Sequence, residues 1–282
     1  MTPPQELDQA GSATDRPVLL DTTEIVAHEA ALECSLVPWD SKTFGFAVAQ
    51  ITRIDIGVEG DAVGLFQSFE AWCADRDVRL VSCRLDHERL RESMALEDDG
   101  FRFVEMVYRP RRSLEDLPAP DPAINVAPAS PSDLASIESI AYDAFSTGRY
   151  FIDRRLPPDL SQRRYASWVA SSFEAPNQAV LKAEMDGDLV GFFIVEHRPD
   201  GSVYWHLTAI APSWQGKGVG LNLWKTMLLR HRSEGATFVE TTISAHNTPA
   251  LNLYARLGFT FSAAQMTFHR LRDSAGGGDR AG

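Results

Sequence analysis

The hydrophobic pattern of the second half of the chain switches between the period of a strand and that of a helix. Two apolar runs rich in β-branched and aromatic residues meet at Asp186-Gly187, a dipeptide that favours a tight hairpin turn. The run SVYWHLTAIAP, residues 202–212, predicts a third strand. Across residues 219–227 every fourth position is apolar, which predicts a helix with one apolar face.

Capping residues mark two further helices. Ser130, followed by a proline, has the N-terminal pattern of one helix. Thr248 and Pro249 begin another, and Gly258 ends it, because glycine readily adopts the left-handed conformation that closes helices. The last strand is expected at residues 259–271.

Strands precede and follow helices, and one hairpin lies among them. This order predicts an α/β fold with a mixed central sheet flanked by helices. Prolines crowd residues 113–124, which indicates an extended linker and a domain boundary. We therefore expect a smaller α/β domain at residues 18–117 and a larger domain at residues 122–272. The ends, residues 1–17 and 273–282, are polar and aperiodic and are expected to be disordered.

An internal similarity links the two halves of the chain. Residues 79–103 align without gaps with residues 237–261, strand to strand and helix to helix, and both segments end in Gly-Phe-x-Phe. Either the halves share an architecture, or two unrelated strand-helix-strand units happen to end alike. Leu96 stands where the second copy has Tyr254, and the first half lacks a glycine-rich turn. The first copy would therefore keep the packing of its strands and helix but lack the residues for ligand binding and catalysis.

Charge and composition restrict the function. The 282 residues include 27 Lys and Arg against 39 Asp and Glu, and the net charge of −12 argues against a general affinity for nucleic acid or an anionic membrane. An anionic substrate would need a local basic patch. No run approaches the length of a membrane span, and the N-terminal residues lack the pattern of a signal peptide.

The three cysteines, Cys34, Cys73 and Cys83, are odd in number and lack CxxC spacing. Reduced thiols in a cytoplasm fit this pattern better than a disulfide framework or a zinc site. The sequence therefore predicts a cytoplasmic protein, and no metal is implied.

The segment QGKGVG, residues 215–220, places three glycines directly before the predicted helix. Glycines allow successive N–H groups to converge on one anion at a helix N-terminus. The spacing excludes the dinucleotide fingerprint GxGxxG, because Leu221 stands at the third glycine, and it excludes the P-loop. A turn without a ligand is the alternative; the glycine density favours a phosphate cradle.

Two motifs in order resemble the acetyl-CoA signature of the GNAT N-acetyltransferase superfamily: Q-x-x-G-x-G at 215–220 and N-x-x-A-x-x-x-Y-x-x-x-G-F at 247–259. The resemblance covers residues 122–272 and implies a GNAT fold there. If the internal similarity reflects a shared architecture, the smaller first domain is a degenerate half of that fold. It implies that acetyl-CoA lays its pyrophosphate on the glycine-rich turn and its pantetheine along the preceding strand edge. The binding residues it implies are Ala209, Ile210, Gln215, Gly216, Lys217, Gly218, Val219, Gly220 and Asn247.

Acetyl transfer from a thioester to an amine needs a proton donor for the thiolate and an acceptor for the amine's proton. Tyr254 suits the first role, because a phenol with a pKa of about 10 is protonated at neutral pH, and it lies two helical turns after Asn247. Its alternative is a core tyrosine. His206 is our candidate base, with Glu196 as the other, although a histidine in an aromatic strand can equally belong to the core. The N–H of Ile210 is the candidate oxyanion donor.

A closer resemblance covers nearly the whole chain. The segments WDSKTFGF (39–46), STGRYFID (146–153) and RRYASWVASS (163–172) resemble the TDP-fucosamine N-acetyltransferases. The resemblance implies acetylation of the 4-amino group of a nucleotide-linked 4-amino-4,6-dideoxyhexose, with Arg149 and Tyr150 binding this substrate. Gly148-Arg149-Tyr150 stands here where that family usually has Ser-Arg-Phe.

Five arginines lie within residues 149–164. Their planar, bidentate donors suit a sugar diphosphate, whereas the alternative is a solvated helix face paired with carboxylates. We predict an N-acetyltransferase using acetyl-CoA on a small-molecule amine, most simply an amino sugar bound to a nucleotide. The alternatives are an acetyltransferase for aminoglycoside or protein amines, with a cleft lined by carboxylates rather than arginines, and a CoA-binding regulatory module without turnover. The sequence leaves open whether the protein forms a homodimer.

Overall fold

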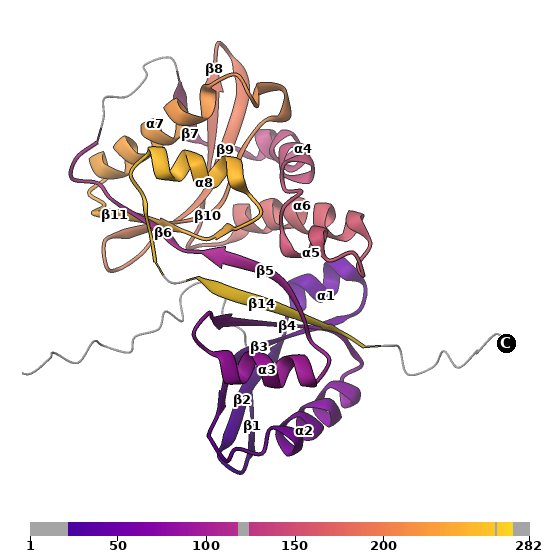
Figure 1. Cartoon of the computed structure of the whole chain (residues 1–282). Coiled ribbons are helices and arrows are strands. Elements are labelled where there is room, and N and C mark those ends of the chain that lie inside the picture. Colours follow the sequence, from indigo (N-terminus) through magenta and orange to yellow (C-terminus); the bar gives the residue numbers. More distant parts are fainter. Residues whose placement is uncertain (1–21, 118–123, 263, 273–282) are drawn as a thin grey trace, which may run out of the picture.

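The computed structural model describes residues 22–117, 124–262 and 264–272. These residues form two seven-stranded sheets, each flanked by helices, which lie one above the other in Figure 1. Both sheets contain parallel and antiparallel neighbours, so the predicted α/β class with mixed sheets is confirmed. The predicted tails, residues 1–17 and 273–282, and residues 118–123 of the predicted linker lie outside the described residues.

The first sheet takes most of its strands from the first half of the chain. Its spatial order is β1 (Thr23–Ala27), β2 (Ala30–Leu36), β3 (Ala47–Ile56), β4 (Val78–Asp86), β14 (Gln265–Leu271), β5 (Arg102–Tyr108) and β12 (Ile243–Ser244). β3 and β4 are parallel and are joined by α2 (Ala62–Asp75). The other helices of this lobe are α1 (Pro38–Phe44) and α3 (Leu90–Asp98).

The second sheet repeats this plan. Its spatial order is β13 (Thr260–Phe261), β6 (Pro110–Ser113), β11 (Phe238–Thr241), β10 (Ser202–Ile210), β9 (Asp188–His197), β8 (Ala179–Met185) and β7 (Asn125–Pro128). β10 and β11 are parallel and are joined by α7 (Val219–Ser233). The remaining helical elements are η1 (Pro131–Asp133), α4 (Leu134–Ala144), α5 (Arg149–Ile152), α6 (Pro158–Glu174), η2 (Pro212–Trp214) and α8 (Thr248–Arg256).

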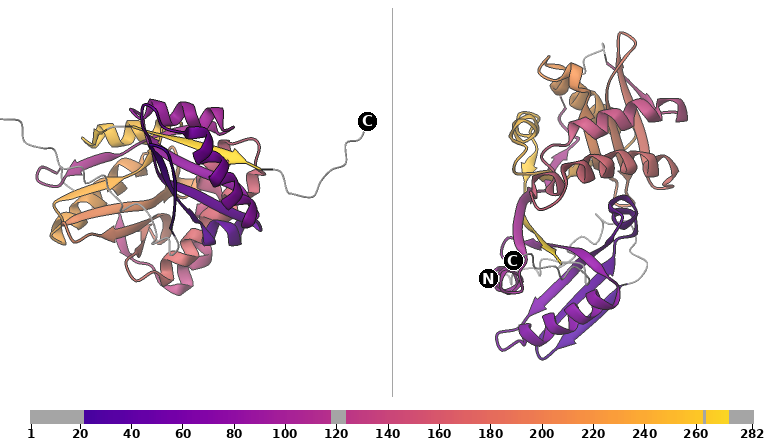
Figure 2. Two further views of the ribbon diagram at one scale, coloured as in Figure 1. Left: turned by 90° about the horizontal axis from the view of Figure 1, so that it is seen from below. Right: turned by 90° about the vertical axis from the view of Figure 1, so that its right-hand side faces the viewer.

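The two lobes exchange strands. β6 follows β5 along the chain but lies between β11 and β13 of the second sheet. β14 follows β13 but lies between β4 and β5 of the first sheet. The exchanged strands, together with β5, run between the lobes in the views of Figure 2. The single last strand expected at residues 259–271 is therefore wrong: the chain forms β13 and β14, in different sheets, because it crosses from one lobe to the other between them.

The two aligned sequence segments have the same build. Each contains a strand, a helix and a strand, with a strand from the other lobe inserted between the two strands. The second segment also contains β12, which joins the first sheet. Helices α3 and α8 coincide position by position in the alignment, and Gly100 and Gly258 both follow their helix with positive φ (82° and 76°). That the first lobe is a degenerate copy remains our proposal. The division into residues 18–117 and 122–272 also stays a prediction, and strands from each side of it join both sheets.

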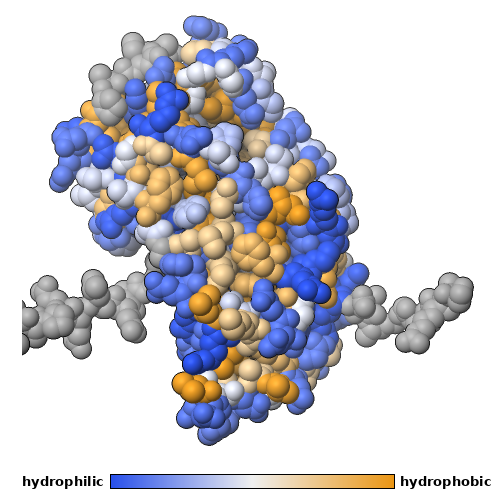
Figure 3. Space-filling view, viewed as in Figure 1, coloured by the Kyte–Doolittle hydropathy of each residue, from blue (hydrophilic) through white to orange (hydrophobic). Residues whose placement is uncertain are grey.

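Separate apolar cores hold the elements in place. In the first lobe α2 and α3 pack on one face of the sheet, where Cys34, Cys73 and Cys83 lie buried. In the second lobe α7 and α8 cover one face of the sheet and α4 and α6 the other. Polar side chains cover much of the face seen in Figure 3, while Leu90, Met94 and Phe103 of the first lobe are among the exposed large apolar residues.

Candidate active site

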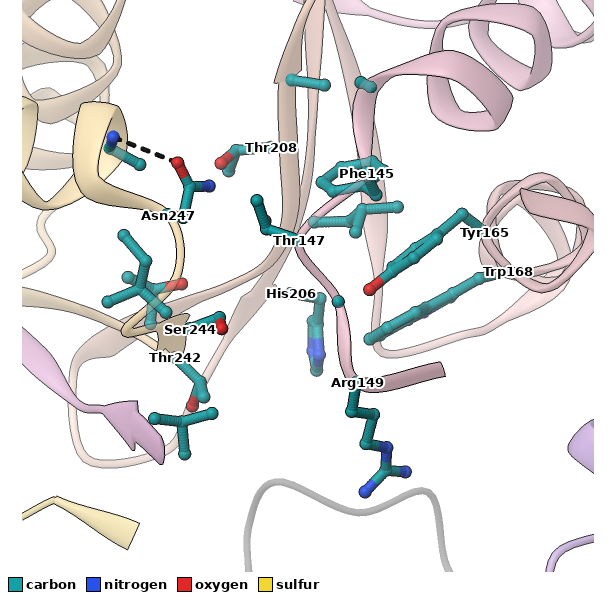
Figure 4. Close-up of a pocket in the computed structure, with 18 of the residues that line it drawn as sticks. Phe145, Thr147, Arg149, Tyr165, Trp168, His206, Thr208, Thr242, Ser244 and Asn247 are labelled. Carbon is teal, nitrogen blue, oxygen red and sulfur yellow. Dashed lines mark hydrogen bonds between the residues drawn. The ribbon is translucent and has the colours of Figure 1, made fainter. Parts of the chain in front are cut away.

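A cavity of about 1400 Å³ lies between the two sheets and is also lined by α6. It brings together Ala209, Ile210, Gln215, Gly216, Gly218, Gly220, Asn247, Tyr254, His206, Arg149 and Tyr150, all of which the sequence singled out. Lys217 and Val219 do not line it. Val219 is buried in the core, and the Lys217 ammonium lies 4.8 Å from the centre of the Trp214 ring. Figure 4 shows part of this cavity.

An open strand edge runs along the cavity. β10 pairs with β11 only from Ser202 to Trp205, and its pairing with β9 shifts register at His206. Such a bulge bends a strand and re-aims the side chain of the extra residue. Because Ala211 donates its N–H to the carbonyl of Val190 on β9, the N–H of the neighbouring Ile210 points away from β9, toward the splayed side.

The glycine-rich turn has the backbone that the sequence predicted. Gly216 and Gly218 have φ values of 75° and 78°, which residues with a Cβ rarely adopt, and open space lies where each Cβ would be. Gly220 packs against the strand, since a Cβ there would lie 2.9 Å from the Ile210 Cδ1. Gln215 donates from its side-chain amide to the carbonyl of Ile210 and ties the turn to the strand. The exposed amides at the start of α7 fit an anionic group such as a pyrophosphate.

Asn247 is placed by a capping interaction that sequence reasoning misassigned. The N-cap of α8 is Asn247, not Thr248, and its Oδ1 accepts a hydrogen bond of 3.2 Å from the backbone N–H of Ala250. An asparagine caps well because its side-chain oxygen reaches the third residue of the helix. This bond turns the amide nitrogen toward Thr208 across the cavity (Figure 4). The N–H donors of Asn247 can therefore face the pantetheine that the resemblance implies.

Tyr254 lies on the same helix, two turns beyond Asn247, and is 3% exposed. Its ring packs edge-on against Phe259 at 4.7 Å. Burial raises the pKa of Tyr254 above that of a free phenol. The phenol is therefore protonated at neutral pH and is available as a donor at the edge of the cavity.

The two candidate bases form one pair. His206 Nε2 and Glu196 Oε2 are 2.7 Å apart, and both residues line the cavity. The His206 ring meets Trp168 and Tyr204 edge-on at 6.3 Å and 4.9 Å. In Figure 4 His206 lies between the Asn247 side of the cavity and the side chains of Tyr165 and Trp168. The alternatives that the sequence left open thus become a single hydrogen-bonded unit.

A buried polar network joins the lobes at the other end of the cavity. The Tyr150 hydroxyl donates to Asp40 Oδ2 at 2.9 Å, and Arg164 Nε donates to Asp40 Oδ1 at 2.6 Å. Arg149 in turn donates to the Tyr150 hydroxyl at 2.9 Å. Tyr150 is 2% exposed, and burial raises its pKa to about 12. Its hydroxyl is therefore engaged in structure, which leaves Arg149 as the more accessible of the two predicted substrate-binding residues.

The five arginines do not form one patch. Arg149 and Arg164 line the cavity, but Arg154, Arg155 and Arg163 do not. Arg155 pairs with the buried carboxylate of Asp153, and Arg163 pairs with Asp159 at the surface. These two arginines therefore pair with carboxylates, which is the alternative to a sugar-diphosphate contact.

Sequence reasoning missed the contribution of the first lobe. Gln50, Arg84, Glu105 and Arg109 line the cavity from β3, β4, β5 and the segment that follows β5. A usable signal was present: in β4, Ser82, Arg84 and Asp86 alternate with the buried residues Cys83 and Leu85, so they mark a strand face opposite the core.

One group of metal-ligand type occurs among the described residues, formed by His197, His231 and Glu234. Trp205 donates its indole N–H to His231 Nε2 at 3.0 Å, so the ring proton sits on Nδ1, which donates to Glu234 at 3.1 Å. Both nitrogens of His231 are thus occupied by hydrogen bonds, an arrangement that does not suit a metal ligand.

The comparisons with known proteins agree with this geometry. The model of the acetyltransferase (GNAT) family matches residues 137–259. An L-2,4-diaminobutyric acid acetyltransferase from Nocardia farcinica is 32% identical over 134 residues, 47% of this chain and 67% of that protein. The chain belongs to the GNAT acetyltransferase family. It is an acetyltransferase, so the alternative of a binding module without turnover is set aside.

Two further similarities extend over both lobes. The spore coat polysaccharide biosynthesis protein SpsD of Bacillus subtilis is 21% identical over 232 residues, 82% of this chain and 80% of that protein. A GCN5-related N-acetyltransferase from Sphaerobacter thermophilus superposes with a TM-score of 0.62 at 18% identity, covering 87% of this chain and 81% of that one. The latter supports the fold alone. In the described residues the helices are too short or too polar to cross a membrane.

Proposed function

We propose that this acetyltransferase moves the acetyl group of acetyl-CoA to the 4-amino group of a nucleotide-linked 4-amino-4,6-dideoxyhexose. The observation that carries the proposal is the charge of the cavity. Six basic residues line it against three acidic ones, in a chain of net charge −12: Lys42, Arg84, Arg109, Arg149, Arg164 and Arg256 against Asp40, Glu105 and Glu196. A local excess of guanidinium groups suits a substrate that carries phosphates.

The same lining disfavours the cationic alternatives. An aminoglycoside or a protein amine would be best matched by unpaired carboxylates. Here Asp40 is bound by Arg164, Glu105 by Arg84, and Glu196 by His206. The name of the B. subtilis relative, which refers to polysaccharide biosynthesis, supports a sugar acceptor by analogy.

The positions of the side chains support the following roles in direct transfer. Acetyl-CoA supplies the acetyl group as an activated thioester. The amides of the glycine-rich turn would hold its pyrophosphate, and the Asn247 amide and the edge of β10 would hold its pantetheine. The Ile210 N–H would stabilise negative charge on the carbonyl oxygen, and the His206–Glu196 pair would take the proton that the amine loses. Tyr254 would give its proton to the sulfur as the C–S bond breaks and the C–N bond forms.

The remaining expectations follow from composition. Three buried thiols suit a reducing compartment, so we place the enzyme in the cytoplasm. The net charge of −12 supports a small-molecule acceptor rather than a nucleic acid. The exposed apolar residues of the first lobe leave a homodimer as a further prediction.

Thiol release from acetyl-CoA tests the proposal. The enzyme would be assayed with TDP-linked 4-amino-4,6-dideoxyhexoses, aminoglycosides and peptide amines, and we expect turnover with the sugar nucleotides. Tyr254→Phe should lower kcat about 100-fold while acetyl-CoA still binds, because it removes only the proton donor. Tyr142→Phe, at an exposed tyrosine outside the cavity, is the matched control and should leave kcat unchanged. Turnover confined to aminoglycosides or peptides would refute the sugar acceptor.

A further inference from the structure

The two faces of the first sheet differ in chemistry. The face under α2 and α3 is a continuous apolar core that includes Ile51, Cys83, Leu85 and Phe268. On the opposite face, Arg84, Thr267, Glu105 and Gln265 form a polar group, beside a second apolar cluster that includes Val48, Leu80 and Leu271. A sheet that buries one face and turns polar side chains to a cavity on the other is suited to bind a polar ligand there.

Three of these polar residues are neighbours across β4, β14 and β5. The register pairs Thr267 with Arg84 on one side and with Glu105 on the other. Arg84 Nε donates to the Thr267 hydroxyl at 3.2 Å, and an Arg84 Nη lies 3.5 Å from Glu105 Oε1. Cross-strand neighbours on one face hold each other in position. Arg84 and Glu105 are thus presented to the cavity as a fixed pair.

One carboxylate oxygen of Glu105 lacks a partner among the described residues. Its side chain is 4% exposed, and within the described residues its Oε2 has no hydrogen-bond partner. A buried carboxylate oxygen left unpaired is costly, because the oxygen has given up water without gaining a donor. On the same face Gln265 lies diagonally from Glu105; its Nε2 donates to Asp86, while its Oε1 also lacks a partner in the described part of the chain. Both residues line the cavity.

We propose that Glu105 is a specificity-determining residue, which accepts a hydrogen bond from a hydroxyl of the acceptor sugar. This inference rests on the proposed function and extends it to the first lobe. Two acceptor atoms and a guanidinium on one face match the donors and acceptors of a hydroxylated ring. A cationic group suits this place less well, because Arg84 already neutralises the Glu105 carboxylate.

Steady-state kinetics with matched acceptors tests the inference. Glu105→Gln keeps the shape and removes the charge, and we expect the acceptor KM to rise about 10-fold while the acetyl-CoA KM stays the same. Glu33→Gln is the control, since Glu33 is a carboxylate of the same sheet that pairs with an arginine, Arg53, outside the cavity. A structural defect in Glu105→Gln would affect every acceptor, so a series of deoxy sugars is included. With the analogue that lacks the contacted hydroxyl, Glu105→Gln and the wild type should have the same acceptor KM.

The outcomes separate this inference from the proposed function. If the wild-type enzyme turns over the sugar nucleotide and Glu105→Gln has an unchanged acceptor KM, or is impaired equally with every deoxy analogue, Glu105 does not read a hydroxyl. If the wild-type enzyme acetylates no sugar nucleotide, the proposed function fails and the inference fails with it. Should Glu105→Gln not fold, Gln265→Met provides the second arm and is expected to show the same dependence on a single hydroxyl.

Discussion

His206 and Glu196 are joined by a hydrogen bond of 2.7 Å between Nε2 and Oε2, although they lie on different strands. His206 is the bulged residue of β10, and Glu196 is near the end of β9. The pair lies in a cavity that is also lined by Tyr254, the proposed proton donor, and by the glycine-rich turn. A carboxylate beside an imidazole stabilises the imidazolium that forms when the ring takes a proton.

The pair should act as one unit in proton removal. His206→Asn and Glu196→Gln are each expected to lower kcat/KM about 100-fold. The double variant should lose little more than either single variant, because removing one member already disables the relay. Kinetics of the four proteins gives the coupling directly. Losses that multiply would show two independent roles, and an unimpaired His206→Asn would assign His206 to packing.

Gly218→Ala should weaken acetyl-CoA binding. The residue has φ of 78°, so an added Cβ strains the turn by about 1–2 kcal/mol and protrudes where the phosphate would approach. Gly187→Ala is the matched control: its φ is 88°, with equally open space, but it lies in the β8–β9 hairpin outside the cavity. Both variants should lose similar stability, while only Gly218→Ala raises the acetyl-CoA KM, by about 10-fold. Equal KM values in the two variants would remove the turn from the binding site.

Local signals predicted much of the fold. The positive-φ pair Asp186-Gly187 turns the β8–β9 hairpin as expected, and Ser130 begins the helical segment as predicted, in a capping box with Asp133. Both features depend on residues a few positions apart. The glycine-rich turn and Tyr254 were likewise predicted to lie at one site, because each belongs to a motif of closely spaced residues, and both line the cavity.

Non-local pairing was not predictable in the same way. The β-strand pattern of residues 265–271 shows that a strand forms but not which sheet it joins, since any edge of matching register is available to it. The insertion of β14 between β4 and β5 is what places Gln265 on the cavity face. Tyr150 was expected to bind substrate, whereas Asp40, far away in the sequence, engages its hydroxyl.

Arg149→Ala should raise the acceptor KM about 10-fold or more and leave the acetyl-CoA KM unchanged. Arg149 lines the cavity at the end remote from Asn247 (Figure 4), where its guanidinium would give a diphosphate bidentate hydrogen bonds. Arg163→Ala serves as the control, because Arg163 belongs to the same arginine-rich segment but pairs with Asp159 at the surface. An acceptor KM that is unchanged in Arg149→Ala, or raised equally in both variants, would argue against a phosphate contact.

His231 should make the protein less stable in acid. The ring is fully buried on α7, and burial lowers its pKa to about 4, against the opposing effect of Glu234. In the unfolded chain the ring regains a pKa of about 6.5. Between pH 4 and pH 6.5 the ring is protonated in the unfolded chain but neutral in the folded protein. The contribution of His231 is therefore complete above pH 6.5 and is lost as the pH falls toward 4, by about 3 kcal/mol in total.

Urea unfolding between pH 7 and pH 4 measures this contribution. His231→Gln removes the titrating ring, and its free energy of unfolding should fall less steeply with acid than that of the wild type. His246→Gln, which replaces an exposed histidine, should keep the wild-type slope. If His231→Gln also keeps that slope, the buried ring is protonated in the folded protein, and the hydrogen bond that Trp205 donates to its Nε2 cannot be the one that holds it.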